Sequence, residues 1–130
     1  MRRILAIVLA VVLGGNSGAL AQAKKPMTAA ELQMLLTKGL SVSSADIEGG
    51  RNFTGRVNLE PGGRLTGTLN VAGHGAIALN GAWKISGAQI CRTLGPAQPE
   101  EVCETWLRNG ADKEVTVQVK GAAVSTNRWQ

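Results

Sequence analysis

The spacing of hydrophobic and polar positions changes near Gly39, which divides the chain into a helical part and a sheet-forming part. Three leucines before this point recur at helical spacing, namely Leu32, Leu35 and Leu36. Thr28 and Glu31 match a capping box, in which each side chain bonds the other residue's backbone amide. Gly39 suits the position just after a helix. We therefore predict one short amphipathic helix over residues 29–38, with its apolar stripe covering one end of a sheet.

After Gly39 the apolar residues alternate with polar ones, which is the period of a half-buried strand. Alternating segments span residues 53–59, 65–71, 77–85, 90–94, 102–107, 114–120 and 123–128. Turn signals such as Pro61-Gly62-Gly63 and Asn109-Gly110 separate them at about the 8–12-residue spacing of a sandwich or barrel. Parallel pairing would require crossover helices, so the sheet is expected to be antiparallel and up-and-down.

Closing this sheet on itself removes its exposed edge strands. Glycines interrupt three of the segments, at Gly55, Gly67 and Gly81, as they do at the sharp bends of a barrel. The fold class expected is therefore mainly β: a small antiparallel barrel of seven or eight strands with one short N-terminal helix.

Residues 1–23 have the layout of a secretory signal peptide: a basic start, an apolar run from Ile4 to Leu13 and small residues before the cleavage site. Cleavage after Ala21 and cleavage after Ala23 both fit. The apolar run is shorter than the roughly 20 residues that span a bilayer, which disfavours a retained membrane anchor. We expect a leader at 24–27, a single barrel domain at 28–130, no membrane span after cleavage, and a periplasmic or secreted location.

Composition narrows the possible partners. The chain has 14 Lys and Arg against 9 Asp and Glu, and loss of Arg2 and Arg3 with the signal lowers the formal charge from +5 to +3. The remaining basic residues are scattered and aromatic residues are few, whereas nucleic-acid binding needs a basic stripe with stacking aromatics. We expect a monomer that does not bind nucleic acid.

Two cysteines remain in the exported part, Cys91 and Cys103. An oxidising compartment favours a disulfide between them, and two free thiols are the alternative. Closing a loop of about 13 residues stabilises the fold by roughly 3 kcal/mol in the chain-entropy picture. The spacing is too wide for a CxxC redox centre, and two cysteines with one histidine do not form a zinc site of usual spacing.

No motif points to an enzyme or a cofactor. Residues 73–78 match G-x-G-x-x-A, but the residues that follow alternate as a strand, and a dinucleotide site needs a helix there. His74 is the only histidine, and no serine has a nucleophile-elbow context. We expect two groups of carboxylates to be solvated: Glu100, Glu101 and Glu104 near Cys103, and Asp46 and Glu48 before Gly49. We expect no catalytic residues, no metal and no cofactor.

Two features are candidates for binding. Trp83 and Trp106 lie mid-strand on either side of the cysteine pair; core packing is favoured for them, and lining a ligand cavity is the functional alternative. Trp129 either docks on the barrel or forms an exposed contact. The segment between the cysteines is a candidate partner-binding loop, stiffened by two prolines; its residues are Arg92, Leu94, Pro96, Gln98, Pro99 and Glu100. A surface loop without a partner is the alternative.

The segment from Trp83 to Arg92, followed by Cys103 and Trp106, resembles a pattern in small secreted bacterial β-barrel proteins of unassigned function. In these a Trp–basic–x–x–Gly strand precedes one cysteine, and a second lies on the next strand. The layout is more distantly similar to periplasmic barrel inhibitors of proteases and lysozyme. The leading hypothesis is an exported, non-enzymatic binding protein that contacts another envelope protein, with hydrolase inhibition as one form of this. The alternative is a carrier of a small apolar ligand within the barrel.

Overall fold

The structure is a computed structural model, and it describes residues 25–96 and 98–130. The predicted signal peptide 1–23, Lys24 of the leader and Ala97 of the cysteine loop lie outside the described residues. The elements are β2 (Lys25–Pro26), α2 (Ala29–Leu36), β3 (Leu40–Asp46), β4 (Phe53–Leu59), β5 (Arg64–Val71), β6 (Gly75–Ser86), β7 (Gln89–Thr93), β8 (Val102–Arg108), β9 (Glu114–Val119) and β10 (Ala122–Arg128).

The strands β3 to β10 form a closed antiparallel barrel. Each strand pairs with its neighbours in the chain, β10 returns to pair with β3, and β8 pairs with β9. β2 is a short addition that pairs with β8 beyond the end of β7. The prediction of a mainly β, up-and-down barrel with one short helix is confirmed.

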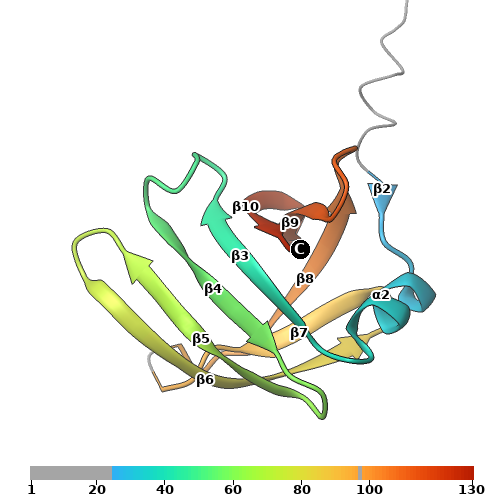
Figure 1. The fold of residues 1–130 in the computed structure, drawn as a ribbon, viewed down its shortest axis with the longest axis horizontal. Helices are drawn as coiled ribbons and strands as arrows, with labels where there is room; N and C mark the ends of the chain where they lie inside the picture. Colours follow the sequence, from blue (N-terminus) through green and yellow to red (C-terminus); the bar gives the residue numbers. More distant parts are fainter. Residues whose placement is uncertain (1–24, 97) are drawn as a thin grey trace, which may run out of the picture.

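Because successive strands run in opposite directions, the connections gather at two ends of the barrel. The loops 47–52, 72–74, 94–101 and 120–121 lie at one end, which we call the mouth. The helix α2 and the turns 60–63, 87–88 and 109–113 lie at the other, which we call the helix end. Figure 1 shows α2 at the opposite end of the strands from the β3–β4 and β5–β6 loops.

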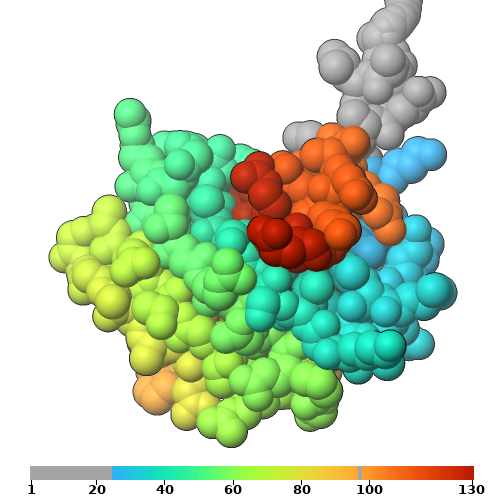
Figure 2. Space-filling view, in the orientation of Figure 1, coloured from blue at the N-terminus to red at the C-terminus, as the bar shows by residue number. Residues whose placement is uncertain are grey.

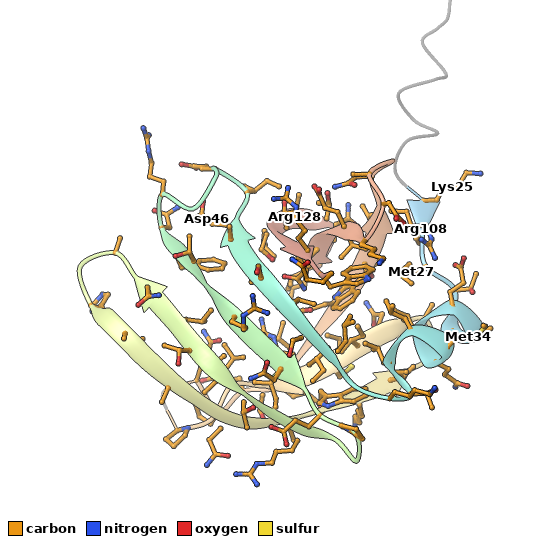
Figure 3. All side chains as sticks on the ribbon, in the orientation of Figure 1. Lys25, Met27, Met34, Asp46, Arg108 and Arg128 are labelled. Atoms are coloured by element: carbon orange, nitrogen blue, oxygen red, sulfur yellow. A yellow bond between two sulfur atoms is a disulfide. The ribbon has the colours of Figure 1, made fainter. Side chains whose placement is uncertain are left out.

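The helix α2 closes its end of the barrel. The capping box is present: the amide of Thr28 donates to Glu31 at 2.9 Å, and the amide of Glu31 donates to Thr28 Oγ1 at 3.1 Å. Leu32 and Leu36 are 0% and 1% exposed, whereas Met34 on the other face is 84% exposed and points away from the barrel (Figure 3). The helix ends at Leu36, two residues earlier than predicted.

The sequence reasoning named no strand at β3, although β3 completes the barrel between β4 and β10. Its inward positions are Leu40, Val42, Ser44 and Asp46 by their alternation. The last two of these four are polar, so the apolar alternation that marks the other strands stops halfway along β3. The expectation of a solvated turn at Asp46 is wrong, because Asp46 is only 5% exposed.

The C-terminus packs onto the helix end of the barrel. The rings of Trp129 and Trp106 stack with centroids 6.1 Å apart, and the amide of Trp129 donates to the carbonyl of Lys113 at 3.0 Å. Figure 2 shows the last residues lying against the segment near residue 110. Of the two alternatives for Trp129, docking on the barrel is therefore the one observed.

The three strand glycines lie where neighbouring backbones approach closely. A Cβ at Gly55, Gly67 or Gly81 would collide with the carbonyl oxygen of Thr68, Arg56 or Thr93, respectively. The structure thus gives these glycines a reason in close contacts between strands, and the bends expected from the sequence stay a prediction. Among the residues that the structure describes, no helix is long and apolar enough to cross a membrane.

Candidate functional site

The interior of the barrel holds a cavity of about 540 Å³ that reaches from the mouth toward the helix end. Its wall is mostly apolar, with residues from all eight barrel strands. The apolar lining comprises Val42, Phe53, Val57, Leu59, Leu65, Leu69, Val71, Ile77, Leu79, Ile90, Leu94, Val102, Trp106, Val119 and Val124. This volume lies within the range of about 300–1,000 Å³ that is usual for small-molecule sites.

The polar groups of the wall form two sets, apart from Gln98 near the mouth. Ser44 on β3 lies directly opposite Asn127 on β10, and Ser125 lies two residues nearer the mouth than Asn127. The other set is Arg92 on β7 and Glu104 on β8. These two are the only ionisable residues among the described residues that line the cavity, so the wall carries no net charge.

Arg92 and Glu104 form a largely buried ion pair. Nε of Arg92 donates to Oε2 of Glu104 at 2.8 Å, and the side chains are 17% and 12% exposed. The indole Nε1 of Trp106 donates to the other oxygen, Oε1, at 3.1 Å. Nη1 of Arg92 is buried without a hydrogen-bond partner. The pair thus leaves hydrogen-bond donors unused in a mostly apolar wall.

The disulfide predicted between Cys91 and Cys103 is present. The two residues lie opposite each other in the antiparallel pairing of β7 with β8. Their sulfurs and a carboxylate oxygen of Glu101 lie within 4.8 Å of one another, but sulfurs bonded to each other provide no thiolate for a metal. The disulfide therefore acts as a covalent cross-link at the base of the candidate loop.

The candidate partner-binding residues divide between two surroundings. Arg92, predicted with the loop, lies instead in β7 with its side chain on the cavity wall. Leu94 and Gln98 line the cavity near its mouth. Exposed residues at the tip are Pro96, Gln98, Pro99 and Glu100. The tip is ordered by two backbone hydrogen bonds, from Leu94 to Gln98 and from Gln98 to Gly95.

The two candidate cavity tryptophans are also separated. Trp106 is 1% exposed and lines the cavity. Trp83 is absent from the described lining; its indole Nε1 donates to the carbonyl of Glu60 at 2.9 Å, near α2 at the helix end. Trp83 thus packs beneath the helix, whereas Trp106 belongs both to the hydrophobic core and to the cavity wall.

Asp46 organises the rim of the mouth, and Figure 3 places it at the opposite end of the barrel from Met34. Its carboxylate accepts hydrogen bonds from the amides of Glu48, Asn52 and Phe53 at 2.8, 2.6 and 2.8 Å. Desolvation of the carboxylate raises the pKa of Asp46, but these hydrogen bonds outweigh it and hold the pKa below its ordinary value. The ionised carboxylate thus fixes the β3–β4 loop.

Two other surface features are weaker candidates for a binding or catalytic site. A polar hollow of about 740 Å³ lies on the outer side of β3–β5 and β10, where Arg128 already pairs with Glu114 at 3.0 Å. His74 is exposed at the β5–β6 turn, and the G-x-G-x-x-A string leads into β6, a strand as predicted.

No family model, no curated protein and no solved structure matches the chain.

The expectation that Glu104 is solvated is wrong, because its side chain is 12% exposed and paired with Arg92. The sequence reasoning also did not identify Arg92 as an interior residue. A signal for them was present in the alternation of positions. Arg92 shares its strand face with Ile90, and Glu104 shares its face with Trp106. Charged residues in phase with buried apolar ones point inward, and this parity indicates a buried pair.

Proposed function

We propose that this chain is an exported binding protein that holds a small apolar molecule inside its barrel. The observation that carries the proposal is the cavity of about 540 Å³, open at the mouth and closed by α2 at the other end. A packed core would fill this space with side chains, because protein interiors are close-packed. The signal layout of residues 1–23 and the disulfide support export.

The rim of the mouth also suits an apolar ligand. Ile47 and Val124 are 49% and 37% exposed, and the amide of Ile47 donates to the carbonyl of Val124 at 3.1 Å. Val124 also belongs to the cavity lining. An apolar path thus runs from the surface into the barrel, and a ligand entering along it exchanges water for apolar contacts throughout.

The binding proposal is tested with N-phenyl-1-naphthylamine, a neutral dye whose emission rises in apolar surroundings. Leu69 lines the cavity, and Thr68 is its exposed neighbour on β5. We expect the wild-type protein and Thr68→Trp to bind the dye, and Leu69→Trp to weaken binding by about tenfold or more because the indole occupies the cavity. Thermal unfolding shows that each variant is folded. A wild-type protein without dye signal, or equal affinities in the two variants, contradicts the proposal.

A second candidate function is contact with an envelope protein through the tip of the cysteine loop. The observation that favours it is the exposed tip at Pro96, Pro99 and Glu100, held at its base by the Cys91–Cys103 disulfide. A loop fixed in this way loses little conformational entropy when it docks.

This second function is tested by mixing the protein with purified lysozymes and periplasmic proteases and measuring hydrolysis rates. Inhibition that is lost in Pro96→Gly/Pro99→Gly and retained in His74→Ala, at another mouth loop, supports the tip. Hydrolysis rates that do not change with the wild-type protein remove the inhibitor hypothesis and leave the cavity proposal untouched.

A further inference from the structure

The Arg92–Glu104 pair has unused hydrogen-bonding capacity. A guanidinium has five N–H donors and no acceptor. Glu104 takes the Nε donor, and its second oxygen accepts from Trp106 rather than from a terminal nitrogen of Arg92. Nη1 is left buried without a partner. Buried nitrogens of this kind are rare in folded proteins, and each one calls for an explanation.

A structural role for the pair explains this geometry poorly. Arginine pairs most strongly with a carboxylate through two parallel hydrogen bonds, and here only one is made. An ion pair inside an apolar wall is also no more stabilising than apolar side chains of similar volume. Nη1 itself is fully enclosed. Arg92 nevertheless lines the cavity with its side chain 17% exposed, and only its Nε has a hydrogen-bond partner among the described residues. Its guanidinium therefore keeps donors that a molecule in the cavity can use.

The charge at the wall selects the kind of acceptor. Arg92 and Glu104 neutralise each other, and they are the only ionisable groups among the described lining residues. A ligand carboxylate at the guanidinium would face the charge of Glu104 inside a mostly apolar cavity, where like charges repel more strongly than in bulk water. A neutral carbonyl oxygen accepts the same hydrogen bond without this repulsion.

We propose that the cavity takes a small apolar molecule that bears one neutral carbonyl oxygen, such as a ketone, ester or amide, and that Arg92 donates a hydrogen bond to this oxygen. The inference rests on the binding function proposed above. Arg92 lies on the inward face of β7, between Ile90 and Leu94, the residue that follows the strand. The carbonyl is therefore held partway along the cavity, and the apolar body contacts the wall on either side.

The experiment compares three naphthalenes of matched size by displacement of N-phenyl-1-naphthylamine. They are 2-acetylnaphthalene, 2-ethylnaphthalene and 2-naphthoate, which differ at one position by a carbonyl, a methylene or a carboxylate. We expect the wild-type protein to bind the acetyl compound about tenfold more tightly than the ethyl compound, and more tightly than the naphthoate. Arg92→Met should lose this preference. Arg56→Met, at an exposed arginine on the outer face of β4, should keep it.

The wild-type comparison does not depend on any variant, so it decides the inference even if Arg92→Met does not fold. Equal or tighter binding of 2-ethylnaphthalene overturns the carbonyl assignment, and tightest binding of 2-naphthoate overturns its neutrality. Either result with the dye still bound leaves the proposed function standing. Failure of the dye and of all three compounds to bind removes the proposed function itself.

Discussion

At the scale of single residues, Asp46 shows how a buried charge orders a loop at the mouth of the cavity. Both of its oxygens accept backbone amides, Oδ1 from Glu48 and Oδ2 from Asn52 and Phe53. An amide side chain of the same shape would place an N–H group against one of these donors. The loop conformation therefore depends on two acceptor oxygens at position 46, and a side chain of the same shape that carries a donor does not replace them.

We expect Asp46→Asn to lower the stability of the protein at neutral pH and to change its response to acid. The pKa of Asp46 in the folded protein lies below the ordinary value of 3.8. The stabilisation from ionised Asp46 is therefore complete above the unfolded-chain pKa and is lost as the pH falls through the lower folded pKa. Urea unfolding midpoints should differ clearly between wild type and Asp46→Asn at neutral pH and converge in strong acid. Glu48→Gln, at an exposed carboxylate of the same loop, is the matched control; a constant difference at every pH argues against the assignment.

At the scale of elements, the β7–β8 hairpin holds the disulfide and the cavity's ion pair on neighbouring positions. Cys91 pairs with Cys103, while Arg92 and Glu104 follow them on the inward face. The cross-link thus keeps the two strands together at the level where Arg92 reaches Glu104. The connecting segment 94–101 is the longest connection between barrel strands, so closing it costs the most chain entropy and a covalent base helps most here.

We expect Cys91→Ala/Cys103→Ala to lower the free energy of unfolding by roughly 3 kcal/mol, the chain-entropy value for a loop of about 13 residues. Reductant should destabilise the wild-type protein by a similar amount and leave the double variant unchanged. Urea denaturation with and without dithiothreitol measures both effects. A double variant as stable as the oxidised wild type contradicts this role for the disulfide.

At the same scale, the close approach of β4 and β5 requires a residue without a side chain at Gly55. A methyl group at Gly55 would meet the carbonyl of Thr68 and the side chain of Leu69 on the adjacent β5. Gly87, by contrast, is in a turn with open space around it and φ of +60°, which asparagine tolerates.

We expect Gly55→Ala to destabilise the protein by about 1–3 kcal/mol, as overpacking usually does. Gly87→Asn should change stability by less than about 0.5 kcal/mol, as surface substitutions usually do. Thermal unfolding gives the melting temperature of each variant, and so compares a glycine at a close contact between strands with a glycine in an open turn. Equal melting temperatures would show that β4 and β5 can separate at little cost.

At the scale of the whole molecule, the sequence predicted the barrel and the cross-link but only part of the site. Strands with strict apolar alternation, such as 53–59 and 77–85, were found because one face of each is buried. The β3 strand lacks this pattern, since Ser44 and Asp46 face inward. Ser44 lines the cavity opposite Asn127 of β10, and Asp46 accepts backbone amides of the β3–β4 loop. Neither reason is visible in the alternation of β3 itself.

The cavity is a second feature that the sequence pattern alone does not predict. Alternation shows which side chains point into a barrel, but it does not show whether they meet in the middle. That depends on the number of strands, on their tilt and on what covers each end. Here eight strands enclose the space and α2 covers one end only. Trp83 and Trp106 are equivalent in sequence pattern, yet the position of α2 places one beneath the helix and the other on the cavity wall.

A cavity that is filled by a ligand links binding to the stability of the entire barrel. A ligand that binds only the folded protein stabilises it by about 2.7 kcal/mol when its free concentration is 100 times its dissociation constant. For a domain of this size that corresponds to a rise in Tm of roughly 10 °C or more. We expect N-phenyl-1-naphthylamine to raise the Tm of the wild-type protein by this amount and that of Leu69→Trp by about half as much or less, because tenfold weaker binding leaves about 1.4 kcal/mol of stabilisation at the same dye concentration. Thr68→Trp should respond as the wild type does, because its indole lies outside the barrel. An equal rise in all three proteins would place the dye on the outer surface, because binding in the barrel requires the space that the Leu69→Trp indole fills.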